Sequence, residues 1–212
     1  MKKGILYALL IPAFAIMMSP AGADESAGLV AGNLSTAKVC GYGTGYIGGF
    51  VGAGEDVTSI FGSVTYGFSD YTDGRLRLGL ADLDVPGADP RLMIGFDFKY
   101  QLMSYQDKIS DYPFDLAAGL LLEYVNYEGA SVSEVGGNII GSVPFKLSTG
   151  QMVIPYSRLN FRLEHSGKSE NNFRVGFNAG AKYEFNPDLG IYGELQIDGN
   201  SGLFLGLEIR AL

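Results

Sequence analysis

The sequence has few of the residues that most often carry chemistry or covalent cross-links. It contains one histidine, one cysteine and no tryptophan among 212 residues. The single cysteine, Cys40, excludes an intramolecular disulfide, and we interpret it as a small, semi-buried residue near the first strand with no chemical role. One histidine and one cysteine also exclude a metal site built from a His/Cys cluster. We therefore expect no metal site and no cofactor.

Long hydrophobic runs are missing beyond the N-terminus. Lys2 and Lys3 precede an apolar run over residues 5–18, and a small-residue cleavage site at residues 21–23 follows. This order is typical of a secretory signal peptide, which we expect over residues 1–23. The run is short for a membrane-spanning helix and contains Pro12, and no later segment has the pattern of a transmembrane helix.

Positive charge is scarce. The formal net charge is −8, and removal of Lys2 and Lys3 with the leader makes it −10. This balance argues against a nucleic-acid partner. Acidic residues gather in expected connections, such as Asp70 and Asp73, where we interpret them as solvated loop residues because no spacing resembles a calcium-binding loop.

Alternation of apolar and polar residues is the dominant pattern after about residue 57, and residues 91–102 show it most clearly. One phase is Leu92, Ile94, Phe96, Phe98, Tyr100 and Leu102, and the other is Arg91, Met93, Gly95, Asp97, Lys99 and Gln101. Successive side chains of a strand point to opposite faces. Each such segment is therefore expected to be a strand with one apolar and one charged face.

Ten segments of this kind are expected, separated by turns rich in Gly, Asn, Asp and Pro. They are residues 42–53, 57–68, 74–83, 91–103, 113–126, 136–146, 152–164, 172–184, 189–198 and 202–211. The pattern predicts an all-β fold, a closed antiparallel transmembrane β-barrel of about ten strands, with eight strands as the alternative. Residues 24–37 are small and polar and are expected to form a flexible periplasmic lead-in. Residues 38–212 are assigned to the barrel domain.

The expected connections at one end of the barrel are short, near residues 54–56, 84–90, 127–135, 165–171 and 199–201. Pro144 and Pro155 conflict with a barrel interior, because proline donates no hydrogen bond to a ladder. We place both at a bulge or beyond the membrane band. The Gly-rich stretch at 41–50 contains G-x-G-x-x-G, but no helical pattern follows, so a nucleotide fingerprint is not supported.

Alternation alone does not tell whether the apolar face of each strand points outward or inward, since a lipocalin-like barrel has the same period with the apolar face inside. Three features favour an outward apolar face. The charged phase is interleaved with glycine, which leaves room in a narrow lumen. The opposite phase is uniformly large, as in Leu76, Leu78 and Leu80. Tyrosines and phenylalanines gather near strand ends, as interfacial girdles do.

Charges that face a confined lumen must be paired, because a buried ion without its partner is costly. Symmetric hairpins would place Arg77 opposite Asp97, Glu164 opposite Arg174, and Lys182 within reach of Glu194. The full expected lumen charge network is Arg75, Arg77, Asp97, Lys99, Glu123, Arg158, Arg162, Glu164, Arg174, Lys182, Glu194, Glu208 and Arg210. Two functions fit this network: a plugged barrel with a structural role, or a narrow porin-like channel for small solutes. We favour the plugged barrel, since about ten strands leave little space beyond side chains.

The single histidine, His165, is the residue to weigh for a catalytic role, and it lies in the run Glu164-His165-Ser166. A His and a Ser close together on a strand resemble the lipid A deacylase barrels, and a lipid A-modifying enzyme is the second alternative. Adjacent strand residues point to opposite faces, so Ser166 and His165 are not expected to meet. Omptin-type proteases need paired acidic residues on long extended strands, for which this chain is too short. We expect no catalytic residues and no enzyme.

The leader, the ten-residue alternating strands, the Gly-rich first strand and the final strand at 202–210 resemble small bacterial outer-membrane barrels. The similar families are the OmpA transmembrane domain and the OmpX-like proteins, and the resemblance covers about residues 40–212. It implies location in the cell outer membrane, with outer-membrane lipids, lipopolysaccharide and the barrel assembly machinery as partners. The oligomeric state stays open.

Overall fold

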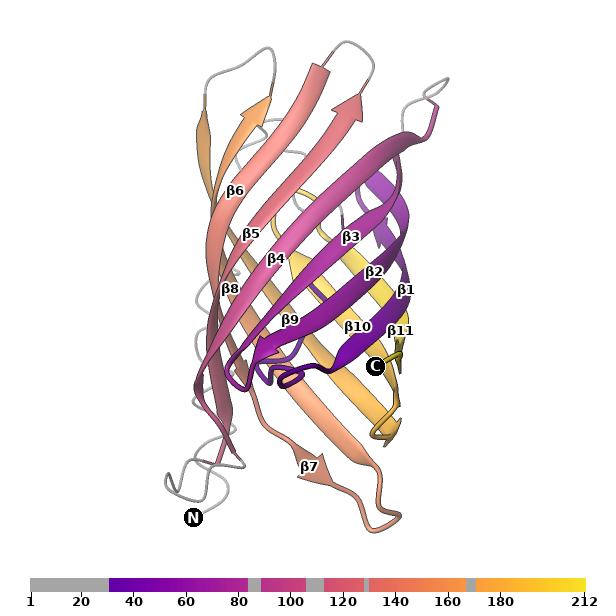
Figure 1. Ribbon diagram of the computed structural model, residues 1–212. Helices are drawn as coiled ribbons and strands as arrows, with labels where there is room; N and C mark the ends of the chain where they lie inside the picture. The colour runs from indigo at the N-terminus through magenta and orange to yellow at the C-terminus, as the bar shows by residue number, and fades with distance from the viewer. Residues whose placement is uncertain (1–30, 84–88, 106–112, 128–129, 167–170) are drawn as a thin grey trace.

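The protein is a single β-barrel in the computed structural model, which describes residues 31–83, 89–105, 113–127, 130–166 and 171–212 (Figure 1). The expected signal peptide at 1–23 and the expected lead-in at 24–30 lie outside these residues. The strands are β1 (Gly45–Gly54), β2 (Val57–Ser69), β3 (Thr72–Leu83), β4 (Arg91–Met103), β5 (Asp115–Tyr127), β6 (Ala130–Ser142), β7 (Phe145–Lys146), β8 (Met152–Ser166), β9 (Asn172–Asn186), β10 (Leu189–Ile197) and β11 (Gly202–Arg210). No helix in the described part of the chain is long and apolar enough to cross a bilayer.

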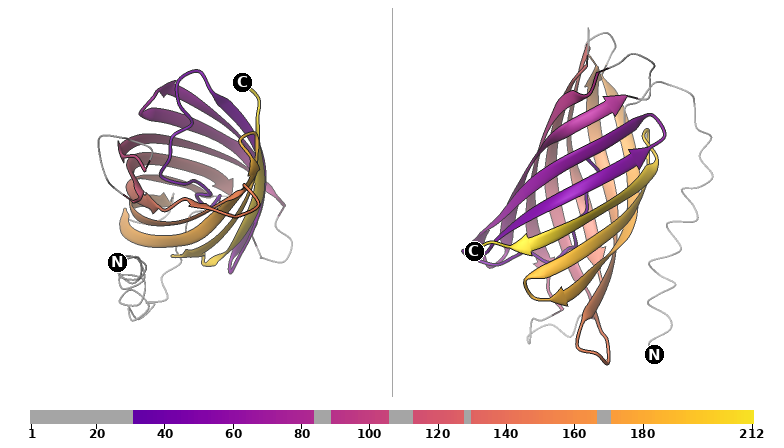
Figure 2. Two further views of the ribbon diagram at one scale, coloured as in Figure 1. Left: turned by 90° about the horizontal axis from the view of Figure 1, so that it is seen from below. Right: turned by 90° about the vertical axis from the view of Figure 1, so that its right-hand side faces the viewer.

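Ten long strands close the barrel, and every neighbouring pair is antiparallel. The first strand pairs with the last, β1 with β11, and β6 pairs with β8 across the short β7 excursion. Figure 2 shows the closed ring in the view from below. The ten-strand prediction is therefore confirmed. The eight-strand alternative is wrong, because the Gly-rich first segment is a full member of the sheet.

Most strand ends lie within three residues of the prediction, and the two ends of β6 differ by more. Strand β6 begins at Ala130, inside the loop expected at 127–135, and Glu134 pairs with Glu123 of β5 in regular register. Its serines and glycines conceal the alternation that apolar residues would reveal. At its other end β6 stops at Ser142, ahead of Pro144. Pro155 lies one residue beyond the last β6–β8 pair, Ser142 with Tyr156, so both prolines sit where the ladder is interrupted.

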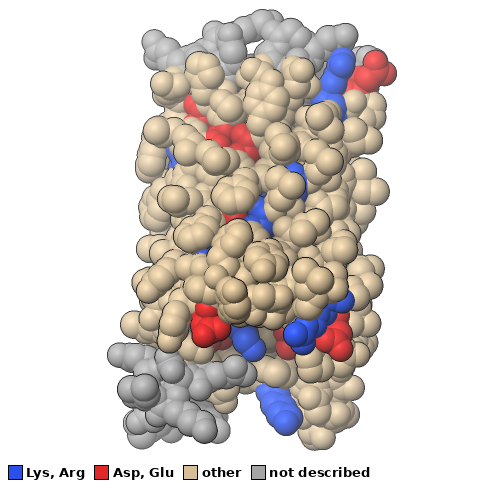
Figure 3. Space-filling view, in the orientation of Figure 1, with Lys and Arg blue, Asp and Glu red and all other residues tan. Residues whose placement is uncertain are grey.

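The two phases of each strand face opposite sides of the wall. Leu78 is 54% exposed on the outside, whereas its neighbour Arg77 is 0% exposed on the inside. The same division holds for Leu203, Leu205 and Leu207 of β11, all of which are outside. Figure 3 shows a wall made mainly of uncharged side chains, with charged atoms visible in small patches between them.

Residues 31–44, called the lumen segment below, begin inside the barrel and lead out of it to the start of β1. Ala31, Asn33 and Ala37 are fully buried, and Leu34 is nearly so. In the view from below, this part of the chain crosses the inside of the ring (Figure 2). The expected flexible lead-in at 24–37 is thus wrong for residues 31–37. Small, polar residues allow a chain to be disordered, but they also let it pass through a narrow lumen lined by hydrogen-bonding side chains.

Candidate functional site: the occupied lumen

The lumen has an aromatic side and a charged side. Inward residues of β1, β2, β10 and β11 form the aromatic side, where the Phe50 and Phe61 rings stack 5.1 Å apart. Phe204 and Tyr192 belong to the same buried cluster, and Leu34 of the lumen segment packs with it. This aromatic side was not predicted, because large apolar residues were expected on the outer face. Phe50 lies among glycines, and its alternation is therefore weak.

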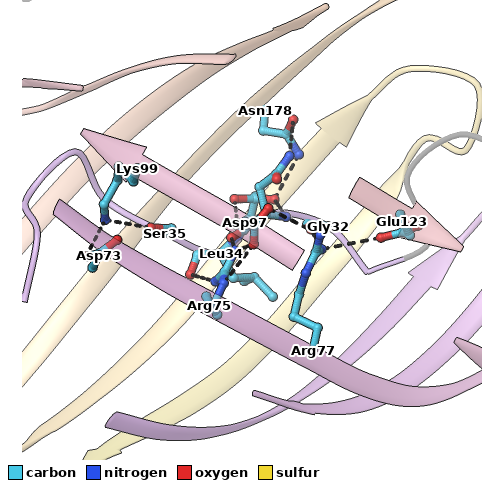
Figure 4. A network of polar contacts seen from close by, with 12 residues as sticks. Gly32, Leu34, Ser35, Asp73, Arg75, Arg77, Asp97, Lys99, Glu123 and Asn178 are labelled. Carbon is cyan, nitrogen blue, oxygen red and sulfur yellow. Dashed lines mark hydrogen bonds and ion pairs between the residues drawn. The ribbon is translucent and has the colours of Figure 1, made fainter. Parts of the chain in front are cut away.

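The remaining strands supply most of the charged side, to which β10 and β11 add Glu194 and Glu208. Its centre is a chain of ion pairs from β3 to β5. Arg75 Nη2 lies 2.7 Å from Asp97 Oδ2, and Arg77 Nη2 lies 3.3 Å from Asp97 Oδ1. Arg77 Nη1 continues the chain to Glu123 Oε2 at 3.4 Å. Figure 4 shows Arg75 and Arg77 pointing to the same carboxylate from one strand. One aspartate therefore serves two arginines.

These cations also bind the backbone of the lumen segment. Arg75 Nη1 donates to the Leu34 carbonyl at 3.0 Å, Arg75 Nη2 donates to the Asn33 carbonyl, and Arg77 Nη1 donates to the Gly32 carbonyl at 2.7 Å. Because the segment forms no sheet with the wall here, its carbonyl groups need such donors. The arginines thus replace a backbone ladder.

Lys99 and Asp73 bind the segment closer to β1. Lys99 Nζ donates to Ser35 Oγ at 3.1 Å and to the Thr36 carbonyl at 3.0 Å, and it lies 3.4 Å from Asp73 Oδ2 (Figure 4). Asp73 in turn accepts from the Cys40 amide at 3.1 Å. Asp73 was expected in a solvated loop; instead it is a buried residue of β3.

Glu194 accepts the amides of the deepest described part of the segment. Its Oε1 accepts from the Asn33 amide and its Oε2 from the Leu34 amide, both at 2.8 Å. Tyr156 Oη and Asn178 Nδ2 each donate to the same carboxylate at 2.8 Å. Four neutral donors therefore surround one buried carboxylate, and the expected Lys182–Glu194 pair is not the arrangement found.

A second ion cluster lies towards the end of the barrel where β8 and β10 end, opposite the C-terminus. Arg162 Nε is 3.0 Å from Glu134 Oε2, and Arg162 Nη1 is 3.0 Å from Asp198 Oδ2. The register places Glu123, Glu134 and Glu164 side by side on β5, β6 and β8. Like charges directly opposite one another are destabilising. Arg77 and Arg162 reduce the repulsion within this row, because Arg77 pairs with Glu123 and Arg162 with Glu134. Glu134 and Asp198 were absent from the predicted network, because Glu134 was expected in a loop and Asp198 at the very end of a strand.

Lys182 forms the last inward cluster. Its Nζ lies 3.0 Å from Glu184 Oε1 and 3.3 Å from Glu208 Oε2, and Tyr192 Oη donates to Glu208 at 2.8 Å. Arg210 was expected in the lumen network but is exposed at the rim, where it approaches Asp188 at 3.8 Å. Strand β11 ends at this residue, so its side chain lies at the mouth of the barrel.

The expected partners are each displaced by two residues. Asp97 is directly opposite Arg75 rather than Arg77, and Arg174 is opposite Arg162 rather than Glu164. The symmetric-hairpin assumption is the error, because the two loops divide their residues unequally between strands. A shift of two keeps every side chain on its face, whereas a shift of one would move it to the other side. Arg77 still reaches Asp97 diagonally, and the Arg174 side chain is only half-buried.

Glycines in the inward phase leave room for the charges. A Cβ on Gly95 would lie 2.9 Å from Arg77 Nε, and one on Gly176 would lie 2.8 Å from Asp198 Oδ2 and 2.9 Å from Arg162 Nη1. Alanine at either position would displace an ion pair. The alternation of charge and glycine in the sequence therefore has a steric cause.

The remaining chemical candidates lie apart from the lumen. His165 is exposed on the outer phase of β8, and its Nδ1 is 2.9 Å from Asn171 Oδ1. An amide is its partner, where a catalytic triad would have a carboxylate. Within the described residues, no three His, Cys, Asp or Glu side chains are grouped so that they could hold a metal ion.

The sequence matches no protein-family model and no curated protein. Among solved structures, the chain is similar to the β domain of the Bordetella autotransporter Brka, with a TM-score of 0.48 and 13% identity over 81% of this chain and 99% of that one. It is also similar to the N-terminal β-barrel domain of Pseudomonas aeruginosa OprF, with a TM-score of 0.41 and 13% identity over 81% and 99% of the two chains. A KdgM porin gives a TM-score of 0.39 and 10% identity over 79% and 99%.

Proposed function

We propose that this protein is an integral outer-membrane β-barrel with a structural role, whose lumen is filled by its own chain and by buried ion pairs. The membrane location is supported by the outer wall. Leu76, Leu78, Leu92 and Ile94 of β3 and β4 are exposed, as are the outward residues of most other strands. A soluble monomer rarely exposes a continuous apolar surface of this kind, whereas lipid requires it.

The lumen segment is the observation that favours a plugged barrel over a narrow channel. It lies along the inside of the wall and is held by Arg75, Arg77, Lys99 and Glu194. Side-chain donors and acceptors at several successive positions make it an ordered part of the barrel interior. Solutes that enter the lumen would have to displace these hydrogen bonds.

Conductance across a planar bilayer tests this proposal. We expect the mature protein to show no discrete openings, and a variant lacking residues 31–40 to show them, because the deletion removes the segment from the lumen. Lys99→Met is a milder change than the deletion, because it removes only the hydrogen bonds of Lys99 to the lumen segment. Lys146→Met on the exposed β7 hairpin is its control. Discrete openings of the unaltered protein would overturn the plugged barrel and support the porin-like channel.

The proposed partners follow from the same location: outer-membrane lipids, lipopolysaccharide and the barrel assembly machinery. We propose no catalytic activity, since the ring of His165 contacts an amide and faces outward. We expect the lipid A mass spectrum of cells to be unchanged by His165→Ala. A modified lipid A that disappears with this substitution would instead support a lipid A-modifying enzyme.

A further inference from the structure

Arg158 differs from the other buried cations of the described lumen. Arg75, Arg77, Lys99 and Arg162 each form an ion pair with a carboxylate. Arg158, on β8, is only 2% exposed, yet its Nε and Nη1 have no hydrogen-bond partner, and no ion pair to it is found among the described residues. Buried charges are normally paired. This guanidinium therefore has both donors and charge to offer.

The nearest carboxylates cannot take up these donors without losing others. Glu194 already accepts from four neutral groups, the Asn33 and Leu34 amides, Tyr156 and Asn178. Asp97 is shared between Arg75 and Arg77. Asp97 and Glu194 thus stabilise the charge of Arg158 electrostatically without satisfying its Nε and Nη1 groups.

A cavity of about 120 Å³ lies beside Arg158, between the lumen segment and the wall. Its basic lining residues are Lys38, Arg75, Lys99, Arg158 and Lys182. The acidic ones are Asp73, Asp97, Glu184 and Glu208, and each of these four is already paired with a cation. Lys38 is exposed and Lys182 lies near the end of β9, so the cavity opens towards the end of the barrel that carries the C-terminus (Figure 1).

We propose that this cavity binds a small oxyanion, a phosphate or carboxylate group, through the guanidinium of Arg158. Planar oxyanions and phosphates match the fork of an arginine side chain. Water could satisfy the N–H groups, but it carries no negative charge to balance a lining in which five cations face four carboxylates. An oxyanion would supply both the hydrogen-bond acceptors and the negative charge.

Calorimetric titration of inorganic phosphate into the mature protein, folded in a non-ionic detergent, tests the site. The buffer contains only a bulky sulfonate as its other anion. We expect saturable binding by the unaltered protein and at least tenfold weaker binding by Arg158→Gln. Arg210→Gln, which removes a rim cation paired with Asp188, should bind phosphate as the unaltered protein does. Acetate in a parallel titration separates carboxylate from phosphate preference.

Two results would overturn the proposal: no saturable binding of either anion by the unaltered protein, or equal binding by Arg158→Gln. Should Arg158→Gln fail to fold, Arg158→Lys keeps the charge but loses the forked donors, and weaker binding is again expected. Crystals of the unaltered protein soaked in selenate give an independent measurement. An anomalous peak within hydrogen-bond distance of Arg158 supports the site, and a cavity that holds water alone refutes it.

Discussion

At the scale of single residues, a buried cation is stabilised by the carboxylates that surround it. Two arginines of the same strand differ in this respect. Arg162 contacts Glu134 and Asp198, each at 3.0 Å, whereas Arg158 has no carboxylate partner. Both point into the lumen, four residues apart on β8. Removal of Arg162 breaks two buried ion pairs, whereas removal of Arg158 breaks none among the described residues.

We therefore expect Arg162→Met to lower the free energy of unfolding by about 3–5 kcal/mol, the usual cost of breaking a buried ion pair. Arg158→Met is the matched control and should cost clearly less in an anion-poor buffer. Urea titration of the protein folded in lipid vesicles measures both. Equal losses for the two variants would mean that the ion pairs of Arg162 contribute little to stability.

At the scale of elements, the lumen segment is held from Gly32 to Cys40 mainly by side chains of β3, β4 and β10, and backbone pairing with β2 begins only at Gly43 and Thr44. Cys40 reports on this arrangement, because it lies where the segment leaves the lumen and its amide binds Asp73. Burial, with a further contribution from the Asp73 carboxylate, raises the pKa of the Cys40 thiol from its usual 9.0 to about 12. Lys99 offsets only part of this rise.

A raised pKa keeps the thiol protonated, and only the thiolate is an efficient nucleophile. At pH 8 we expect maleimide to react with folded Cys40 about a thousandfold more slowly than with an exposed thiol. The rate should continue to rise with pH up to about 12, as the pKa requires. The urea-unfolded protein is the control. A folded-state profile that levels off near pH 9 would show that the segment leaves the lumen readily.

At the scale of the whole molecule, the barrel is inside-out relative to a soluble protein, with charges in the interior and apolar side chains on the wall. The absence of tryptophan from the sequence makes this sidedness easy to measure. Leu78 points outward from the middle of β3, and Tyr42 lies outside the strands before β1. Either position can therefore carry a single fluorescent reporter.

We expect brominated acyl chains to quench Leu78→Trp strongly and Tyr42→Trp weakly, since only the first side chain would contact hydrocarbon. Fluorescence of the two variants in vesicles of brominated and ordinary lipid measures the difference. A Leu78→Trp signal that brominated lipid leaves unchanged, in a protein that stays monomeric without detergent, would contradict the membrane-spanning barrel.

The sequence alone predicted most of the strands, their number as about ten, and the face that most of their residues occupy. The reason is local: a period of two assigns each side chain to one side of a strand, and Arg77 beside Leu78 shows the assignment. The same reasoning was weak where the outward residues are small, as at the beginning of β6, and Glu134 was therefore missed.

Only the tertiary structure decided which charges meet and what fills the lumen. Partners depend on how loops divide their residues between strands, and an error of two residues leaves every face unchanged while it exchanges Arg75 for Arg77 opposite Asp97. The position of residues 31–44 is a non-local property as well. Their small, polar side chains carry no period, and their place is set by backbone groups that bind Arg75, Lys99 and Glu194, residues distant in the chain.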